Sequence, residues 1–202
     1  MTSYTKSSLI SIGLLLTLPM ASHGATVVFE DDFDSETLTF NHTNFVNWTV
    51  SEGSVDLVGA GFNDILPGNG RYVDLDGTTF NAGILTSTTI NLNPGSYTLS
   101  FKLGGGARSN INPGNEDTVD VSFGSVYSES FTLAITDPLT AYSRTFTVNS
   151  LTSASIVFDH AGGDNFGIFL DDVALTSVPV PAAAWLFSSG ILGLIGVSRR
   201  KL

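Results

Sequence analysis

The feature that most constrains the fold is a two-residue alternation of apolar and polar side chains between Thr26 and Ser177. It is clearest in Ser96–Leu103, where Tyr97, Leu99, Phe101 and Leu103 occupy every second position. Residues two apart lie on the same face of a β-strand, so this pattern predicts strands that each bury one face. Turn-forming glycine, asparagine and proline separate the runs, and helical periodicity is not sustained anywhere. The sequence therefore predicts an all-β fold, an antiparallel β-sandwich built around one core.

The first 25 residues have the composition of a secretory signal peptide. Lys6 supplies a short basic region, Leu9–Met20 an apolar region, and small residues up to Ala25 a cleavage site. We expect residues 1–25 to be removed on export. Residues 26–177 are then predicted to form the β-sandwich domain, which is long enough for a single core.

Residues 178–202 have a different organisation. Prolines 179 and 181 bracket a hinge, an uncharged apolar span covers residues 182–197, and three basic residues lie near the end. As a helix the span would rise about 24 Å at roughly 1.5 Å per residue, against a hydrocarbon core of about 30 Å. We expect one short transmembrane helix, whose basic end stays on the cytoplasmic side.

This tail resembles the PEP-CTERM sorting signal in its Val-Pro-x-Pro-Ala-Ala variant. The matching residues are Val178, Pro179, Pro181, Ala182, Ala183, the run Trp185-Leu186-Phe187, the glycine-spaced run 189–196, and Arg199, Arg200 and Lys201. The resemblance implies that an exosortase, a membrane cysteine peptidase, recognises the tail and removes the helix in or near the prolines. It also implies a Gram-negative host that makes exopolysaccharide. A membrane anchor that stays attached is the alternative.

The charge of the predicted domain is strongly one-sided. All 19 acidic residues of the chain lie in it, whereas its basic residues are Arg71, Lys102, Arg108 and Arg144, which leaves a net charge of −15. Such a surface repels phosphate backbones, so we expect no nucleic acid partner. The chain contains no cysteine, which removes disulfides and zinc–thiolate sites.

The order of motifs in this domain resembles the jelly-roll, galactose-binding-like modules of carbohydrate-binding domains. The motifs are the acidic turn 31–34, the run Tyr72–Gly77, the strand that begins at Pro94-Gly95, the turn 162–167 and the run Leu170–Leu175. The resemblance implies a structural calcium ion that joins the first and last strands. Its ligands would be Asp34 and Asp171, with Glu30 and Asp32 nearby.

The residue types suit calcium, which binds about six to eight oxygen atoms, backbone carbonyls included. Asp171 shares the alternation of Phe169 and Val173, so we expect its side chain to point inward and that of Asp172 to point outward. An inward carboxylate needs a partner, and a cation is one candidate. The alternative is that these carboxylates cap loop amides.

A sugar site would need an exposed aromatic side chain with polar neighbours. The candidate rings are Trp48 and Tyr72, with Arg71 and Asp74 as hydrogen-bonding neighbours, and Phe62 and Tyr142 are further possibilities. A place in the core is the alternative for each ring. Carbohydrate binding of this lectin-like kind is one of three hypotheses for the function.

The leading hypothesis is an exported, non-enzymatic surface or extracellular-matrix protein, sorted by an exosortase and associated with exopolysaccharide or biofilm. The third hypothesis is a small polysaccharide hydrolase. The sequence has no Gly-x-Ser-x-Gly motif, and Asp159-His160 at a strand end is better explained by local polarity than by catalysis. A cleft with two facing carboxylates would favour the hydrolase.

Overall fold

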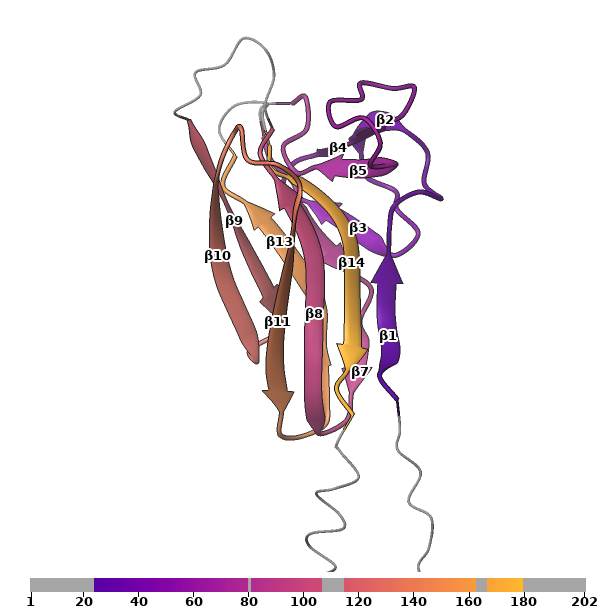
Figure 1. The fold of residues 1–202 in the computed structure, drawn as a ribbon, viewed down its shortest axis with the longest axis vertical. Helices are drawn as coiled ribbons and strands as arrows, with labels where there is room; N and C mark the ends of the chain where they lie inside the picture. The colour runs from indigo at the N-terminus through magenta and orange to yellow at the C-terminus, as the bar shows by residue number, and fades with distance from the viewer. Residues whose placement is uncertain (1–23, 80, 107–114, 163–166, 180–202) are drawn as a thin grey trace, which may run out of the picture. The chain divides into compact units, whose positions relative to one another are not determined.

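The computed structural model describes residues 24–79, 81–106, 115–162 and 167–179, and Gly24–Pro179 is one compact unit. This unit is an antiparallel β-sandwich, as Figure 1 shows, so the predicted fold class is confirmed. Residues 1–23 of the predicted signal peptide, the apolar span and the basic residues Arg199 and Arg200 lie outside the described residues, as does Pro181. Within the described part of the chain, no helix is long and apolar enough to cross a membrane.

The larger sheet has seven strands in the order β11-β8-β14-β5-β4-β2, and β1 also pairs with β14. Its strands are β1 (Thr26–Asp31), β2 (Thr39–His42), β4 (Val55–Gly59), β5 (Arg71–Asp74), β8 (Gly95–Gly104), β11 (Thr140–Val148) and β14 (Phe169–Ser177). Every pair in this sheet is antiparallel.

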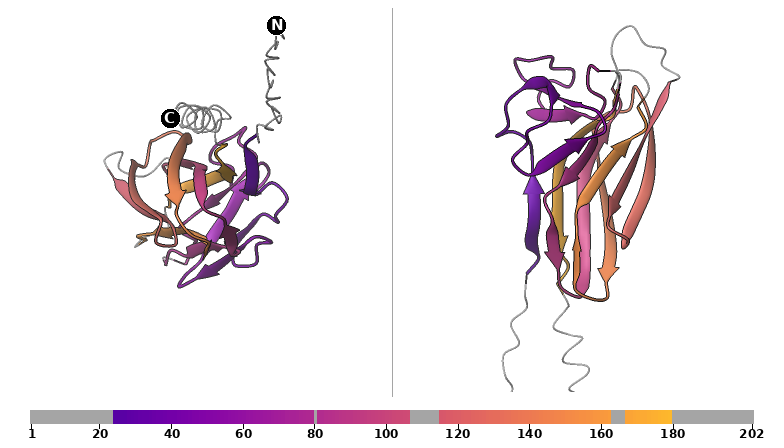
Figure 2. Two further views of the ribbon diagram at one scale, coloured as in Figure 1. Left: turned by 90° about the horizontal axis from the view of Figure 1, so that it is seen from below. Right: turned by 180° about the vertical axis from the view of Figure 1, so that it is seen from behind.

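The second sheet has five strands in the order β10-β9-β13-β6-β3, and Figure 2 shows it from behind. Its strands are β3 (Trp48–Ser51), β6 (Ile84–Ser87), β9 (Glu116–Phe123), β10 (Tyr127–Ala134) and β13 (Ile156–His160). A short pair, β7 (Ile90–Leu92) and β12 (Thr152–Ala154), completes the domain.

The core lies between the two sheets and is made by the alternating residues that the sequence indicates. In β8, Leu99, Phe101 and Leu103 are buried, and the Phe101 ring packs edge-on against Phe131 and Phe158 of the other sheet. Burial of one such apolar side chain contributes about 1.5–3 kcal/mol. The period-two pattern therefore fixes which face of each strand meets the core.

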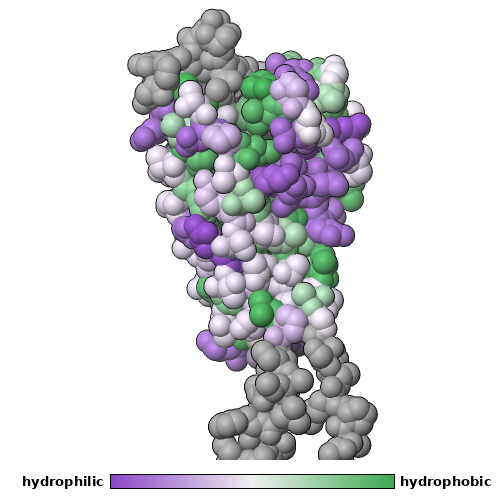
Figure 3. All heavy atoms as spheres, viewed as in Figure 1, coloured by the Kyte–Doolittle hydropathy of each residue, from purple (hydrophilic) through white to green (hydrophobic). Residues whose placement is uncertain are grey.

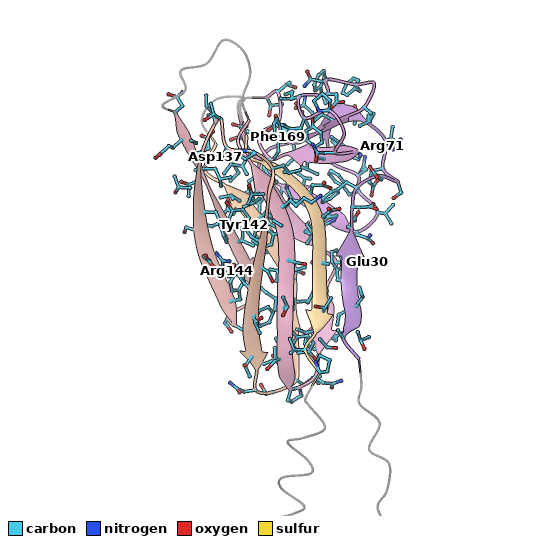
Figure 4. The ribbon with its side chains drawn as sticks, in the orientation of Figure 1. Glu30, Arg71, Asp137, Tyr142, Arg144 and Phe169 are labelled. Atoms are coloured by element: carbon cyan, nitrogen blue, oxygen red, sulfur yellow. The ribbon has the colours of Figure 1, made fainter. Side chains whose placement is uncertain are left out.

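One edge of the sandwich is fastened by a pair of charged residues. Arg144 of β11 donates from Nε and Nη2 to the two carboxylate oxygens of Glu129 in β10, at 2.7 and 2.8 Å. The guanidinium group also lies 5.3 Å from the Phe131 ring and 5.9 Å from the Tyr142 ring. Tyr142 packs on Phe101 and Phe131, so this half-buried ring helps to join the sheets (Figure 4).

A bulge in β14 changes the expected orientation of Asp171. The register of β14 on β8 shifts between Asp171 and Ala174, and Asp172 has a φ of 49°. The extra residue places Leu170 and Val173 both in the main core, while Phe169 packs in a separate cluster with Val58 and Tyr72. The prediction that Asp171 shares a face with Val173 is therefore wrong. Asp171 is nevertheless buried and Asp172 exposed, as expected.

The two ends of the described unit meet at one end of the sandwich. Thr26 pairs with Ser177 and donates from its backbone N to Ser177 Oγ at 3.1 Å, and Val178 N donates to Ser96 O at 2.8 Å. We call this end, where β1 begins and β14 ends, the base. The opposite end carries the long connections, including residues 60–70, and we call it the loop end (Figure 1).

Candidate functional site

Acidic side chains meet at the point where β14 changes its neighbour. β5 pairs with Phe169 and Leu170, whereas β1 pairs with β14 from Val173 onward. Asp34, just after β1, accepts a hydrogen bond from Arg71 N at 2.8 Å, which holds the end of β1 against the start of β5. We call Asp34, Asp171, Asp172 and Lys102 the acidic junction.

The carboxylate of Asp171 lies in an environment that disfavours its charge. It is 3 % exposed, and burial, with the neighbouring Asp172 and Asp34 carboxylates, raises the pKa of Asp171 to about 6. Asp171 Oδ1 accepts from Asp172 N at 2.8 Å, while Oδ2 lies 3.6 Å from Lys102 Nζ. Lys102 also pairs with Asp172, and this contact raises the pKa of Lys102. Burial and the two neighbouring carboxylates thus favour the protonated form of Asp171, while the Asp172 amide and Lys102 oppose them.

The four predicted metal ligands do not form one group. The charge of Asp34 reaches Asp171, whereas Glu30 and Asp32 line a neighbouring hollow that shares only Asp172 with the acidic junction. Figure 4 labels Glu30 on β1, below Arg71. Among the described residues, no three His, Asp or Glu side chains are placed as a metal site would need them. Asp34 and Asp171 both accept backbone amides, which is the capping role that the sequence left open.

Asp31, which the sequence did not single out, is the best-bonded carboxylate of this region. It is buried and accepts from Phe33 N at 2.9 Å, Asn47 Nδ2 at 3.0 Å and Trp48 Nε1 at 3.0 Å. Its inward position follows from the strand alternation, because it lies between the exposed Glu30 and Asp32. Asp31 therefore fixes the turn that presents Asp34.

Neither candidate aromatic ring offers a face to a ligand. Trp48 is 2 % exposed and packs against Phe29, Phe33 and Phe158, so it belongs to the core. Tyr72 is fully buried on the outer face of the larger sheet. The core alternative therefore holds for both rings.

Tyr72, Arg71 and Asp74 hold the loop end together. Tyr72 Oη accepts from the backbone N of Ile65 and Leu66 at 2.6 and 2.7 Å and donates to Asp64 Oδ1 at 3.1 Å. Asp74 is buried and accepts from Gly167 N at 3.0 Å. Arg71 Nη1 donates to the carbonyl of Glu36. These contacts order the loops, and Arg71 remains half-buried.

An exposed aromatic pair lies on the loop end, and the sequence analysis named only one of its members. Phe40 of β2 is 41 % exposed, and its ring centroid lies 4.7 Å from that of Phe62. The next residue, Asn41, has a φ of 52° and donates from its backbone N to Asp56 Oδ1 at 2.8 Å, within an irregular part of the β2–β4 pairing. We call Phe40 and Phe62 the aromatic pair. The isolated Phe40 within Thr39-Phe40-Asn41-His42 could have indicated it.

Two facing carboxylates lie on the second sheet. Asp120 of β9 and Asp159 of β13 are direct cross-strand partners, and with Glu52 they line a hollow beside His160. Burial, followed by the charges of Asp120 and Glu52, raises the pKa of Asp159. His160 lies on the buried side of β13, opposite Asp159.

The two described histidines of the predicted domain each bind a nearby backbone amide. His160 Nδ1 accepts from Gly162 N at 3.0 Å. His42 Nδ1 accepts from Asn44 N, and the His42 ring stacks on Phe45.

Comparison with known proteins finds similar structures at low identity. No family model matches the sequence, and no curated protein matches it. A carbohydrate-binding module from Cellvibrio mixtus lichenase 5A is 13 % identical with a TM-score of 0.42, over 76 % of this chain and 99 % of that one. The K3 cleaved adhesin domain of Lys-gingipain from Porphyromonas gingivalis is 18 % identical with a TM-score of 0.48, over 77 % and 100 %.

A family 35 carbohydrate-binding module from Clostridium thermocellum is 12 % identical with a TM-score of 0.45, over 74 % of this chain and 99 % of that one. Other matches are chains of glycoside hydrolases, of which this chain covers less than a third.

Proposed function

We propose that this chain is an exported, non-enzymatic carbohydrate-binding protein of the cell surface or extracellular matrix, with the aromatic pair as its sugar-binding platform. The observation that carries the proposal is the exposure of Phe40, whose ring packs at a tilt against Phe62 at the loop end. Three kinds of group suit a sugar here: an aromatic face for the C–H face of a pyranose, and amides and carboxylates for its hydroxyls.

Polar side chains are available beside the pair. Asn63 follows Phe62 with a φ of 48° and is exposed, as is Asn69 of the same loop. Tyr72 fixes this loop through the Ile65 and Leu66 amides, so the platform is ordered before a ligand arrives. Such preorganisation lowers the entropic cost of binding.

The test is binding to exopolysaccharide from the producing host, by pull-down and by glycan array. We expect the Phe40→Ala variant to bind at least about tenfold more weakly, equivalent to about 1.4 kcal/mol. Leu151→Ala is the matched control, because Leu151 is also an exposed apolar residue but lies at the base. Equal binding by the wild type and Phe40→Ala, or no glycan binding at all, would contradict the proposal.

Calcium binding at the acidic junction is part of the proposal. Asp34 and Asp171 would supply carboxylate oxygens, and the ion would offset the burial of Asp171 and the repulsion from Asp172. Glu30 and Asp32 would act from the neighbouring hollow. If the ion binds, added calcium raises the melting temperature of the wild type and leaves that of Asp171→Asn unchanged. An unchanged melting temperature of the wild type on addition of calcium would contradict calcium binding.

Export and sorting complete the proposal. An exosortase would act on the tail that begins at Val178 and Pro179, and the product would associate with exopolysaccharide or biofilm. The intact mass of the protein from its native host tests this directly. We expect a chain that lacks residues 1–25 and everything beyond the Pro179–Pro181 block, and retention of residues 182–202 would indicate an anchor instead.

A small polysaccharide hydrolase is the second candidate, and the facing pair Asp120 and Asp159 favours it. Retaining glycosidases use two carboxylates about 5–5.5 Å apart, one of them with a raised pKa. Release of reducing sugar from host exopolysaccharide, lost in Asp159→Asn, would establish this activity. Its absence in the wild type would exclude it.

A further inference from the structure

The base of the sandwich carries no charged side chain. The first charged residues met on β1 and β11 are Glu30, which pairs with Ala174, and Arg144, which pairs with Leu99. Residues 26–28, 86–98, 145–157 and 176–179 supply the base, and none of them is Asp, Glu, Lys, Arg or His. These four segments are far apart in the sequence and are brought together by the β1–β14, β14–β8 and β11–β8 pairs. In Figure 3 most of the strongly hydrophilic residues lie in the upper part of the view, toward the loop end.

Exposed apolar side chains gather on the same end. Val27, Val28, Leu151 and Val178 are four of the six large exposed hydrophobic residues among those described, with Leu151 74 % exposed. The polar groups between them are hydroxyls and amides, from Thr26, Thr147, Asn149, Ser150 and Ser177. An exposed surface of this kind, apolar with neutral polar groups, suits the interfacial layer of a membrane.

The short distance in sequence between the base and the apolar span indicates what the base would contact. Val178 N is hydrogen-bonded to Ser96 O, so the fold holds the chain up to this residue. The apolar span begins at Ala182, and four Cα steps of at most about 3.6 Å reach roughly 14 Å. The headgroup layer on one side of a bilayer is about 5–7 Å thick. If residues 182–197 enter a bilayer, the base therefore lies at or next to the headgroups.

We propose that the base is a membrane-docking surface, which rests on the phospholipid headgroups while the C-terminal span is in the bilayer. This inference rests on the sorting proposed above, because it requires the apolar span to be membrane-inserted. The base has no carboxylate for an anionic leaflet to repel, and its valines and leucine can enter the interface. The loop end, with its aromatic pair, then faces away from the membrane.

The test uses the exported chain with its C-terminal span intact, reconstituted into phosphatidylcholine–phosphatidylglycerol vesicles. The chain has no native cysteine, so single reporters can be placed cleanly. Asn149→Cys reports from the base and Ala60→Cys from the loop end, each labelled with a fluorophore. Lipids with a nitroxide on the headgroup then quench a reporter that lies at the surface. Flotation of the vesicles first shows that the chain is inserted.

We expect quenching at position 149 to exceed that at position 60 several-fold. Adding Leu151→Glu should lower the quenching at 149, because a charge is introduced next to the headgroups. Val46→Glu is the matched control, since Val46 is 77 % exposed but lies beside Glu36, beyond the end of β1. It should leave the quenching at 149 unchanged.

Each other result overturns the inference in a recognisable way. A chain that floats with the vesicles but is quenched equally at 149 and 60 is anchored without docking. If the chain does not float with the vesicles, both the membrane insertion of the span and the docking of the base are contradicted. Disulfide-linked dimers of unlabelled Asn149→Cys, with no quenching at 149, would show that a second copy covers the base.

Discussion

The loop end and the base of this sandwich are formed by the same strands but differ in backbone conformation. At the loop end and the turns that lead to it, non-glycine residues adopt left-handed φ angles, among them Phe33, Asn41, Asn63 and Asp172. Buried carboxylates accept the amides that these turns release. At the base no non-glycine residue has a left-handed φ angle, and the side chains are hydroxyls, amides and exposed apolar groups without charge. The left-handed residues and the buried carboxylates that bind their amides therefore belong to the loop end and the turns that lead to it.

This difference changes how the acidic composition is understood. Asp31, Asp56, Asp74, Asp76 and Asp171 are all buried, so some of the carboxyl groups lie inside the domain rather than on its surface. Asp56 and Asp74 are direct cross-strand partners, which places two of these carboxylates together. The acidic residues therefore serve the loop architecture as well as solubility, and a stability defect is expected mainly from changes at this end.

The largest expected effect is at Asp31. Asp31→Ala removes the acceptor of Trp48 Nε1, Asn47 Nδ2 and Phe33 N, and it leaves a buried indole N–H without that bond. We expect a loss of about 3–5 kcal/mol in the free energy of unfolding, measured by urea denaturation. Thr147→Ala at the base is the control and should change it by less than about 0.5 kcal/mol. Similar losses in both variants would contradict the claim that stability depends more on the loop end than on the base.

The next effect is the pH dependence that Asp171 brings. The pKa of Asp171 in the folded domain is about 6, above the unfolded value of 3.8, so the folded state binds the extra proton. Its contribution to stability therefore rises as the pH falls from 7 to 4, by up to about 3 kcal/mol. The difference in unfolding free energy between the wild type and Asp171→Asn isolates this contribution. A difference that is constant from pH 4 to pH 7 would contradict the raised pKa.

Bound calcium would reverse this pH dependence. The ion favours the ionised carboxylate, so it stabilises the domain more at pH 7 than at pH 5. Differential scanning calorimetry of the wild type at both pH values, with and without calcium, measures the effect. A stabilisation that is larger at pH 5 than at pH 7 would show that the ion binds somewhere other than Asp171.

A smaller and more local effect is expected at Tyr72. Tyr72→Phe removes the hydroxyl that accepts the Ile65 and Leu66 amides, at a cost of about 1–3 kcal/mol. Hydrogen exchange should accelerate in residues 60–70 and stay unchanged in β8 and β11. Uniform acceleration across both regions would mean that the loop and the core unfold together.

The smallest effect is expected at Leu151. Leu151→Ala removes an exposed side chain from the base, so the free energy of unfolding should change by less than about 0.5 kcal/mol. Urea denaturation checks this. A loss above about 1 kcal/mol would show that Leu151 is a packing residue rather than a surface residue.

The sequence predicted the strands and the core well because period-two alternation depends on local geometry. Tyr97 to Leu103 alternate as expected, and all the alternate apolar positions are buried. The orientation of Asp171 could not be predicted in the same way, because the bulge at Asp172 arises from pairing with three other strands. The apolar–polar periodicity of one strand does not predict such a register shift.

The candidate site was predictable only in part for the same reason. Asp34 and Asp171 come close because β1 and β14 pair, and the resemblance to jelly rolls implied that a calcium ion joins these first and last strands. Trp48 and Tyr72 are aromatic residues next to polar ones, and sequence alone does not say which face of a sheet another layer or loop covers. Phe40 is exposed and stands next to the left-handed Asn41, a backbone conformation that a single asparagine in the sequence does not predict.

The most direct test of the account is hydrogen exchange of the domain with and without exopolysaccharide from its host. The account predicts that the glycan slows exchange in β2 and in residues 60–70, around Phe40 and Phe62, and leaves the first residues of β8 and the last of β11 unchanged. Slowed exchange at the base, or none at the loop end, would contradict the claim that the loop end is the binding end of this protein.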